Sequence, residues 1–459
     1  MSRDKNGFSA LKVSVLGGAG YVGLITGLGL AAIGHRVIGA DIDGARIRLL
    51  RAGKSPVFEG GLEDLLKHCI SAGAIEFSTS PREAIRGSDV VFIAVGTPMR
   101  EDGHSDLSQI IHACEDLQDS IDRYTVIAVK STAPVGSIQF MRGILSRTKT
   151  EGTDFDLVAN PEFLREGSGM TDFFYPDRIV VGTSSERARA VLRRLYDPII
   201  RKHVEWPEPP GRDRSAAIPL VETDEASAQM IKYAANAFLA ARISFINEIA
   251  GLCEGVGADV KEVVRGLGFD PRIGTSYLSA GLGFGGPCLE KDLRALIKIS
   301  MDVSYEPRVL RAVLERNTLQ LQDVVAKIQQ VAGTPLYQKT IGVLGLAFKA
   351  GTNDLRNSLA VRLINTLEQE GAHLRVHDPV ARYEPEAAPA GVTFFEDPYD
   401  AAVDAEALVV ATDWPEFIGL DFARIRSLMA RPVVVDARNL LDPAALRRLG
   451  FTYVGVGVR

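Results

Sequence analysis

Short apolar segments alternate with longer amphipathic ones over most of the chain. In the N-terminal part the apolar segments are strand-sized and rich in β-branched residues: LKVSVLG, VIGAD, DVVFIAV, TVIAVKST and FDLVAN. Strands that alternate with helical patterns are typical of a parallel, doubly wound α/β sheet. The same rhythm returns near the C-terminus in KTIGVLGLAF, HLRVHDP, ALVVATD and PVVVDAR. The pattern therefore predicts two Rossmann-like α/β domains, the second an echo of the first.

The region between these domains has a different pattern. The segment KHVEWPEPPGRDRSAAIP is polar and proline-rich, which predicts an exposed loop. A proline-free helical pattern follows from about Thr223 to Glu254, with cap chemistry at Thr223 and Asp224. At about 1.5 Å per residue this helix would be roughly 45 Å long, enough to join domains. We predict α/β domains over residues 1–205 and 331–459 and a central helical domain over 219–330.

Composition narrows the class of protein. Hydrophobic residues make up 46% of the chain, the net charge is −6 and the pI is about 5.8, so no basic field attracts nucleic acid or an anionic membrane. The apolar runs are too short to span a bilayer, and the N-terminus lacks the apolar core of a signal peptide. Four scattered cysteines without a CxxC pair argue against a disulfide framework and a zinc site. We expect a cytoplasmic location and no bound metal.

A glycine fingerprint follows the first predicted strand. Gly18, Gly20 and Gly23 form a GxGxxG motif that opens a helix, where glycines allow a tight turn and close approach of the backbone to a pyrophosphate. Asp41 ends the next strand, and a carboxylate there accepts hydrogen bonds from a ribose and repels a 2′-phosphate. The motif predicts binding of NAD in preference to NADP; the alternative is a glycine turn that binds another nucleotide or none. Arg46, on the following helix, lies either against the adenosine or in solvent.

The second α/β domain has no GxGxxG motif at the equivalent turn. The segment there, GLAFKAGTNDLR, carries Lys349 and Arg356 beyond the end of a strand, where ligands bind in open α/β sheets. Two cations at a helix entrance suit a diphosphate. The alternative is a salt-bridged loop in which Asp354 pairs with Arg356 or Lys349.

Two polar residues share one face of the long central helix. Lys232 and Asn236 are four residues apart, so an ammonium and a carboxamide can donate to one substrate oxygen. Fixed donors of this kind stabilise the charge that develops on an oxygen when hydride leaves the neighbouring carbon. The alternative is a solvated helix face, which the apolar neighbours AANAFLA disfavour.

The loop GFGGPCLEKD places Cys288 at the start of a predicted helix. Its glycines allow a sharp turn, and Pro287 suits a helix entry. A helix N-terminus with Lys291 nearby favours the thiolate form of a cysteine, which is the nucleophilic form. Asp292 returns to the same helix face one turn later. The other cysteines fall within amphipathic helical patterns, and we predict them to be buried and inert: Cys69, Cys114 and Cys253.

Together these features predict an oxidoreductase. The seven histidines make no obvious site, and a simple alcohol dehydrogenase needs no cysteine. A thiolate becomes useful when an aldehyde must be oxidised as well, because it adds to the aldehyde and the resulting thiohemiacetal can lose a second hydride. The thioester that forms then needs water and a base. The residues therefore predict a four-electron oxidation of a primary alcohol to an acid with two NAD⁺.

In these motifs the chain resembles the UDP-glucose 6-dehydrogenases of the UDP-glucose/GDP-mannose dehydrogenase family. The resemblance covers nearly the whole chain, and NPEFLREG and the cysteine loop are more specific than the glycine fingerprint. It rests on GAGYVGL (18–24), GKSPVFEGGLEDLL (53–66), VGTPMREDGHSDLS (95–108), KSTAPVGS (130–137), NPEFLREG (160–167), DFFYPDRIVVG (172–182), KYAANAFLAARISFINEIAGLCEGVGADV (232–260), DPRIGTSYLSAGLGFGGPCLEKD (270–292) and GLAFKAGTNDLRNS (345–358). It implies oxidation of UDP-glucose to UDP-glucuronate, with an NAD-binding N-terminal domain, a UDP-sugar-binding C-terminal domain, and a homodimer or higher homo-oligomer built on the long helix.

The resemblance also implies roles for individual residues. Cys288 would be the catalytic thiol, Lys232 and Asn236 the donors to developing oxyanions, and Glu162 the acid/base for thioester hydrolysis, unless Glu162 simply pairs with Arg165. Asp292 and Thr132 would hold water. Cofactor contacts are implied at Gly18, Gly20, Tyr21, Val22, Gly23, Asp41, Arg46, Thr97, Thr132, Glu166 and Arg356. Substrate contacts are implied at Glu162, Phe163, Leu164, Lys232, Asn236, Arg272, Tyr277, Phe284, Gly285, Phe348, Lys349 and Arg438, with Arg272 crossing a dimer interface.

The chain departs from the family pattern at three places, one of which is a longer loop around 203–218, and rival functions remain. Family members often read GGSCFPKD where this chain reads GGPCLEKD, so Pro287 replaces a hydroxyl and removes an N–H; EGG (59–61) replaces the more usual EPG. A sister enzyme would perform the same chemistry on GDP-mannose or a UDP-N-acetylhexosamine. A β-hydroxyacid dehydrogenase would lack the thiol loop and the second nucleotide domain. A catalytically silent nucleotide-sugar binding protein would lack the thiol, Lys232 or Glu162, and all three are present.

Overall fold

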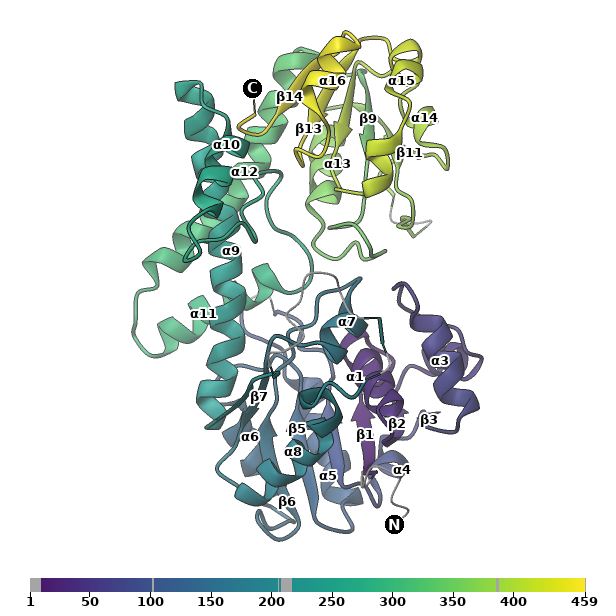
Figure 1. Cartoon of the computed structure of the whole chain (residues 1–459), viewed down its shortest axis with the longest axis vertical. Coiled ribbons are helices and arrows are strands. Elements are labelled where there is room, and N and C mark those ends of the chain that lie inside the picture. The colour runs from purple at the N-terminus through teal and green to yellow at the C-terminus, as the bar shows by residue number, and fades with distance from the viewer. Residues whose placement is uncertain (1–9, 101–102, 205, 208–216, 385–387, 459) are drawn as a thin grey trace. The chain divides into compact units, whose positions relative to one another are not determined.

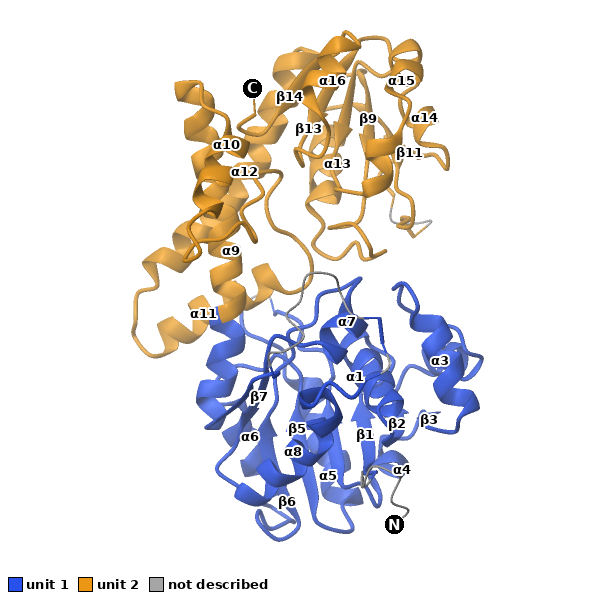
Figure 2. Ribbon diagram, viewed as in Figure 1, with its two compact units in different colours: residues 1–234 blue, residues 235–459 orange. Residues whose placement is uncertain are grey.

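The chain forms two compact units, residues 1–234 and residues 235–459 (Figures 1 and 2). The computed structural model describes residues 10–100, 103–204, 206–207, 217–384 and 388–458. Most of the proline-rich segment predicted as a loop lies outside the described residues. The prediction of an α/β chain with two Rossmann-like domains and a long central helix is confirmed.

Unit 1 is built on an eight-stranded sheet with the order β3-β2-β1-β4-β5-β6-β7-β8. Its central strands are apolar and buried along their whole length, as expected for a sheet covered by helices on both faces. The strands are β1 (Lys12–Leu16), β2 (Arg36–Ala40), β3 (Ile75–Ser78), β4 (Val90–Ile93), β5 (Thr125–Val129), β6 (Phe155–Ala159), β7 (Ile179–Gly182) and β8 (Leu220–Thr223).

One strand pair in this sheet departs from the predicted parallel arrangement. β7 runs antiparallel to β6, whereas the other pairs described are parallel. An antiparallel neighbour begins at the edge where the preceding strand ends. The connecting residues, 160–178, therefore begin and end at the carboxyl edge of β1 to β6, where ligands bind in open α/β sheets. The edge strand β8 was not predicted, because its half-exposed sequence LVET carries no apolar run.

Helices cover both faces of the unit 1 sheet. One face is covered by α1 (Tyr21–Ala32), α2 (Gly44–Arg51), α3 (Leu62–Ser71), α7 (Gly169–Phe174) and α8 (Glu186–Ile200). The other face is covered by α4 (Pro81–Ile85), α5 (Ser108–Ser120) and α6 (Ser137–Leu145), and Ala228 packs into the same core. The predicted burial of Cys69 and Cys114 in these helices is confirmed.

Unit 2 contains a six-stranded, fully paired parallel sheet with the order β11-β10-β9-β12-β13-β14. Its strands are β9 (Thr340–Leu344), β10 (His373–His377), β11 (Val392–Phe394), β12 (Ala407–Val410), β13 (Val433–Asp436) and β14 (Thr452–Gly455). When the strands of each unit are numbered in chain order, the six strands of unit 2 and the first six of unit 1 have the same spatial order, 3-2-1-4-5-6, which is that of a dinucleotide-binding fold. Unit 2 is therefore a structural repeat of unit 1, as predicted.

The remaining helices build the central region and flank the second sheet. The long helix α9 (Glu225–Val256) begins two residues later than predicted, and Asp224 caps it by accepting from the Ser227 N–H at 2.8 Å. Cys253, on this helix, is buried as predicted. The other helices are α10 (Val260–Gly268), α11 (Leu289–Asp302), α12 (Arg308–Ala332), α13 (Leu359–Gln369), α14 (Pro398–Ala401), α15 (Phe422–Leu428), α16 (Pro443–Arg448) and the 3-10 turn η1 (Pro415–Gly419).

The two sheets differ at the acid that follows their second strand. In unit 1, Asp41 is half-buried and uses one oxygen to accept from the Ala19 N–H of the glycine turn at 3.1 Å. In unit 2, Asp378 is fully buried and accepts from five N–H groups, those of Leu346, Ala347, Val380, Ala381 and the Trp414 indole. Because its acceptor positions are occupied from within the fold, Asp378 has no capacity to bind a ribose. The position that binds a ribose in a dinucleotide-binding domain therefore has a structural role in the second domain, where Asp378 occupies it.

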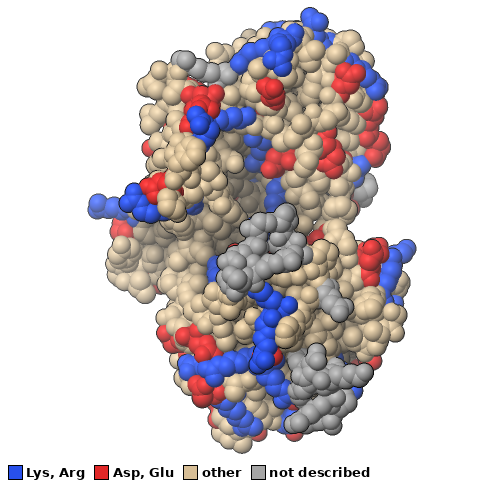
Figure 3. All heavy atoms as spheres, viewed as in Figure 1, with Lys and Arg blue, Asp and Glu red and all other residues tan. Residues whose placement is uncertain are grey.

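The surface carries charges of both signs. On the face shown in Figure 3, basic and acidic side chains are interspersed on each unit. Many charged side chains of the described residues form ion pairs, such as Arg193–Glu222 and Arg82–Asp119. Within the described residues, no helix combines the length and the apolar character that crossing a bilayer would require.

Replacement of Asp378 by alanine is expected to destabilise unit 2 by about 3 kcal/mol or more, because several buried N–H donors would lose their acceptor. The measurement is urea unfolding followed by the fluorescence of Trp414 in a Trp206→Phe background. The matched control is Asp442→Ala, which removes an exposed cap that accepts from Ala444 and Ala445 and should cost only about 1 kcal/mol. Equal losses in the two variants would contradict the assigned role of Asp378.

Candidate active site

The glycine turn between β1 and α1 keeps its backbone open for a ligand. A Cβ on Gly23 would lie 2.1 Å from the Gly17 carbonyl oxygen, and a Cβ on Gly18 would lie 2.8 Å from the Gly39 Cα, so both positions require glycine. A Cβ on Gly20 would meet only one atom, at 3.4 Å. The backbone at Gly20 therefore has open space beside it, an arrangement that suits a pyrophosphate at the start of α1. Val22 lies half-buried in the first turn of this helix.

The acid and the arginine predicted for the adenosine end have different surroundings. Asp41 stands beyond β2 and accepts from the N–H of Ala19 at 3.1 Å and of Asp43 at 3.0 Å. These two bonds fix its carboxylate beside the glycine turn, in the position expected of a ribose acceptor. Arg46 is half exposed and pairs with Asp43 at 3.4 Å, which agrees with the alternative of a surface arginine.

Tyr21 joins the glycine turn to the segment after Glu162. Its hydroxyl donates to Glu59 at 2.6 Å and accepts from the Gly169 N–H at 3.1 Å, while the second oxygen of Glu59 accepts from the Met170 N–H at 2.7 Å. Burial, reinforced by the carboxylates of Glu59 and Glu166, raises the pKa of Tyr21. The Tyr21 hydroxyl therefore forms its hydrogen bonds within the protein. Glu59 holds Tyr21 and the start of α7 in place, a role that the sequence did not reveal.

A buried ion pair forms the centre of the unit 1 site. The Lys232 ammonium donates to Glu162 at 2.8 Å, and both side chains are about 95% buried, with 5% and 6% exposure. The other oxygen of Glu162 accepts from the Leu164 N–H at 2.5 Å. Burial raises the pKa of Glu162, but the Lys232 charge and these hydrogen bonds bring the pKa below its usual value. Glu162 is therefore a carboxylate at neutral pH.

The neighbours of Glu162 confirm that it does not pair with Arg165. The Arg165 guanidinium binds Asp172 at 2.6 Å instead. The centroid of the Phe163 ring lies 3.6 Å from the guanidinium carbon of Arg178 and 5.4 Å from the Lys232 nitrogen. The segment from Asn160 to Arg178 is thus fixed by aromatic and ionic contacts at the carboxyl edge of the sheet.

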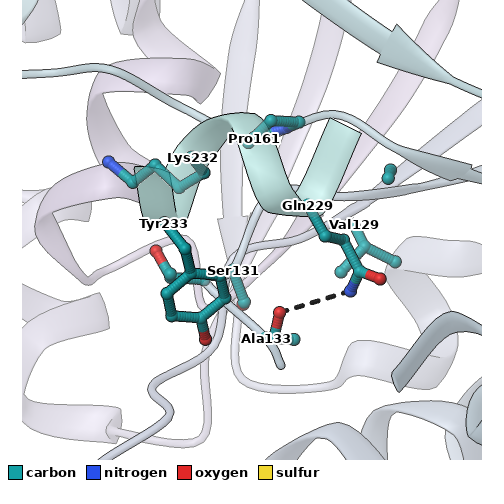
Figure 4. Close-up of a pocket in the computed structure, with 9 residues that line it drawn as sticks. Val129, Ser131, Ala133, Pro161, Gln229, Lys232 and Tyr233 are labelled. Carbon is teal, nitrogen blue, oxygen red and sulfur yellow. Dashed lines mark hydrogen bonds between the residues drawn. The ribbon is translucent and has the colours of Figure 1, made fainter. Parts of the chain in front are cut away.

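A small pocket beside this ion pair brings Thr132 and Lys232 together. It is lined by Val129, Ser131, Thr132, Ala133, Ala159, Pro161, Gln229, Lys232 and Tyr233. Figure 4 shows Gln229, Lys232 and Tyr233 projecting from α9, and the Gln229 amide donates to the Ala133 carbonyl at 3.2 Å. The Thr132 carbonyl accepts from the Thr97 hydroxyl at 2.8 Å, which links two predicted site residues.

Lys130 is a second buried cation that the sequence analysis missed. Its ammonium contacts the Asn160 side-chain oxygen at 3.3 Å and the Tyr196 hydroxyl at 3.4 Å, and Tyr196 donates to the same Asn160 oxygen at 2.6 Å. Burial lowers the pKa of Lys130 to about 8, while the Glu162 charge opposes this shift and the Lys232 charge adds to it. The available signal was a lysine placed directly after the buried strand TVIAV.

In unit 2, Cys288 occupies the N-cap position of α11 and is exposed, in contrast to the three buried cysteines. Asp292, one turn later, is fully buried and accepts from Asn236 at 2.6 Å and from Lys291 at 2.6 Å. Asn236 projects from α9, so this bond fixes α11 against the central helix. Three of the predicted catalytic residues, Asn236, Cys288 and Asp292, therefore belong to one local structure.

The glycines before Cys288 let the loop pack tightly on its neighbours. Gly283 and Gly286 have φ angles of +110° and +83°, which favour glycine. A Cβ on Gly285 would lie 2.6 Å from the Asn357 carbonyl oxygen, and one on Gly286 would lie 2.6 Å from the Phe348 ring. Phe284 is held by Asn317, which accepts from its N–H at 2.8 Å and donates to its carbonyl at 2.9 Å. Asn317 is another bracing residue that local sequence patterns did not reveal.

The predicted nucleotide contacts of unit 2 divide into two groups. Arg438 donates to the carbonyls of Ala411, Gly283 and Phe348, so it lies against the cysteine loop and the segment after β9. Lys349 lies 5.7 Å from the Phe348 ring centroid. Others are turned to surface partners: Arg356 pairs with Asp354 at 2.5 Å, as the salt-bridged alternative expects, and Arg272 pairs with Asp270 while 87% exposed. Tyr277 is half-buried with a φ of +60°.

Comparison with known proteins identifies relatives along the whole chain. Three segments match sequence models of the UDP-glucose/GDP-mannose dehydrogenase family: residues 11–200 match its NAD binding domain, 226–319 its central domain and 342–443 its UDP binding domain. The chain is 40% identical to UDP-glucose 6-dehydrogenase TuaD of Bacillus subtilis (strain 168) over 447 residues, which is 97% of this chain and 93% of the relative.

Solved structures of related proteins share the architecture. A UDP-glucose dehydrogenase from the hyperthermophilic archaeon Pyrobaculum islandicum superposes with a TM-score of 0.89 at 36% identity, covering 99% of this chain and 100% of that one. A UDP-D-ManNAc dehydrogenase from Pyrococcus horikoshii gives a TM-score of 0.83 at 26% identity, covering 97% and 99%.

The buried Lys130 predicts an unusual dependence of stability on pH. Because its pKa is about 8 in the fold and 10.5 in a model peptide, the unfolded chain binds more protons between these values. The free energy of unfolding of the parent, minus that of Lys130→Met, should therefore rise by on the order of 2–3 kcal/mol as the pH increases from 8 to 10.5. This difference should not change below pH 8. The measurement is urea unfolding followed by Trp206 in a Trp414→Phe background. Parallel pH profiles for the two proteins would contradict the assignment.

Proposed function

Since the chain belongs to the UDP-glucose/GDP-mannose dehydrogenase family, we propose that it oxidises UDP-glucose to UDP-glucuronate with two NAD⁺. The observation that carries the four-electron scheme is the exposed Cys288 thiol at the N-cap of α11, one turn before the buried Asp292. The glycine turn and Asp41 form a site that fits NAD, and unit 2 supplies a second nucleotide-type sheet for the UDP part. Each NAD⁺, when bound, would accept one hydride, so the two oxidations would consume two NAD⁺.

The first oxidation requires stabilisation of an alkoxide. As the terminal CH₂OH of the sugar loses a proton and a hydride, negative charge develops on its oxygen. Lys232 is a buried ammonium held by Glu162 at 2.8 Å, and a buried charge interacts more strongly with an oxyanion than an exposed one. Asn236, held by Asp292, is the second donor. The product of this step is an aldehyde.

The second oxidation and the hydrolysis use the thiol. The Cys288 thiolate adds to the aldehyde carbon to give a thiohemiacetal, and loss of a second hydride and a proton gives a thioester. Water then attacks the thioester carbon, the C–S bond breaks, and the thiol is regenerated with release of the carboxylate. Glu162 is ionised at neutral pH and is the base assigned to this water, and Thr132 and Asp292 are the residues assigned to orient the water.

Two alternatives remain for the substrate and for catalysis. The same residues would oxidise another nucleotide sugar, GDP-mannose or a UDP-N-acetylhexosamine; the Pyrococcus structure, named as a UDP-D-ManNAc dehydrogenase, has the same fold. The 40% identity with an enzyme named for UDP-glucose favours glucose. A catalytically silent binding protein is disfavoured because the thiol and the Lys232–Glu162 pair are both intact.

We also propose that the protein is a homodimer formed through α9. Large apolar side chains recur along the exposed side of this helix at Phe238, Phe245, Leu252 and Val256, with exposures of 64%, 54%, 61% and 79%. Their spacing of seven and four residues puts them on one stripe, and a helix stripe of this kind is normally covered. A second copy is the occupant that explains the exposed Arg272, which in the family crosses to the neighbour's substrate.

We propose the cytoplasm as the location. The proposed chemistry needs a reduced thiol, and the four cysteines suit a reducing compartment.

The test of the function is the stoichiometry of turnover. Purified protein incubated with NAD⁺ and a panel of UDP- and GDP-sugars should form two NADH per UDP-glucose consumed. Cys288→Ser should stop at the aldehyde or at a covalent ester, with kcat reduced by about 10³-fold or more, whereas Cys253→Ser, at a buried thiol, serves as the matched control with normal stoichiometry. One NADH per sugar, or full turnover by Cys288→Ser, would contradict the proposal.

The dimer is tested by placing a charge in the stripe. Phe245→Asp should halve the mass measured by light scattering, from twice the 49.6 kDa chain mass to that mass, because a carboxylate cannot be buried unpaired at an interface. Ile418→Asp is the control, since Ile418 is a comparably exposed apolar residue of η1. A mass that stays dimeric in Phe245→Asp, or that is already monomeric in the parent, would refute the interface.

A further inference from the structure

Glu290 lies two residues after Cys288, and its carboxylate is buried although it belongs to the first turn of α11. One oxygen accepts from Arg294 at 2.7 and 2.9 Å. The other accepts from Asn357 at 2.9 Å and from Arg362 at 3.1 Å. The bonds from Arg294 lie within α11, but those from Asn357 and Arg362 come from other elements, and a solvated acid at a helix start would not make them. Glu290 therefore has a role beyond local capping.

Asn357 connects this carboxylate to the backbone of the cysteine loop. Its carbonyl accepts from the Gly286 N–H at 3.1 Å, and its side-chain amide donates to the Gly286 carbonyl at 3.2 Å as well as to Glu290. Its side-chain oxygen accepts from Arg362, on α13. Asn357 has a φ of +55°, a conformation that asparagine tolerates better than most residues. The residues thus form a closed network around Gly286 and Glu290.

This network joins two loops of the proposed site. Asn357 belongs to the segment between β9 and α13 that also carries Phe348 and Lys349, and the Phe348 ring lies against Gly286. Burial raises the pKa of Glu290, but hydrogen bonds from Asn357 and Arg294 and the Arg362 charge bring it below its usual value. The network is therefore charged and intact at neutral pH.

We propose that Glu290 is a positioning residue: with Asn357 and Arg362 it holds the Cys288 loop on the segment that binds the nucleotide sugar. The thiol and the sugar-binding segment then move as one body, so that a bound sugar has a fixed position relative to the sulfur. Glu290 touches neither substrate nor cofactor. The proposal rests on the proposed function of Cys288 as the nucleophile, and it assigns the loop's placement to a residue two positions away.

The first test measures the position of the thiol without any substrate. Iodoacetamide should modify Cys288, since the other three cysteines are buried. Glu290→Ala and Asn357→Gly should each raise the alkylation rate constant of Cys288 about threefold or more, because both free the loop and increase access to the sulfur. Asn357→Gly keeps the positive φ and removes only the side chain. Glu262→Ala, which deletes an exposed acid paired with Arg265, is the matched control and should leave the rate unchanged.

The double variant distinguishes a shared network from independent effects. If Glu290 and Asn357 act together, Glu290→Ala/Asn357→Gly should be no faster in alkylation than the faster single variant. A rate equal to the product of the two single effects, or no change in either single variant, would overturn the proposal. The isosteric Glu290→Gln keeps the side-chain volume, so it decides the matter with the same readout if the alanine variant fails to fold.

Turnover provides the second readout. Since a displacement of about 1 Å at a reacting group can cost up to about 10²-fold in rate, kcat for UDP-glucose should fall about tenfold or more in Glu290→Ala, with the KM for NAD⁺ unchanged. A normal kcat in a folded Glu290→Ala would overturn the proposal. If the parent protein oxidises no nucleotide sugar, the proposed function fails while the alkylation result still decides whether Glu290 positions the loop.

Discussion

A carboxylate removed from water must be paired with a cation or fully hydrogen-bonded, and this constraint shapes the candidate site. Glu162 is buried against Lys232, Asp292 against Asn236, and Glu290 against Asn357 and an arginine. In each case at least one partner comes from a different element of the same unit, although Asp292 and Glu290 also accept from Lys291 and Arg294 of their own helix. The burial of one charge therefore fixes the distance between two elements, which is what a site for hydride transfer requires.

The two nucleotide-type domains show how one topology serves two purposes. Both have the strand order 3-2-1-4-5-6 and an acid after the second strand. Asp41 keeps a half-buried carboxylate beside an open glycine turn, whereas Asp378 uses its oxygens for five internal N–H groups. The two domains share a fold but differ in the hydrogen bonding of this acid: Asp41 can still accept from a ribose, whereas the oxygens of Asp378 are occupied by internal donors.

The geometry of the thiol loop depends on its glycines and on the side chains that contact its backbone. Glycine at 285 and 286 allows contact with Asn357 and Phe348, and Asn317 holds the Phe284 backbone from the other side. Pro287, which departs from the family pattern, precedes the helix N-cap and leaves Cys288 exposed. Contacts from Asn357 and Asn317 thus hold the backbone of this loop, while the Cys288 side chain is exposed.

Local sequence patterns were sufficient to predict the main helices and strands and the chemical groups of the site. Periodicity is a local property, so it identified the two α/β domains, the long helix and the buried cysteines; the motifs identified Gly18 to Gly23, Lys232 and Cys288. The pairing of the polar groups, by contrast, became evident from the folded chain. The antiparallel β7, the pairing of Glu162 with Lys232 rather than Arg165, and the buried Lys130 and Glu290 depend on residues far apart in the chain. Local patterns carry no information on such contacts, because a buried charge is stabilised by a partner on another element of the fold.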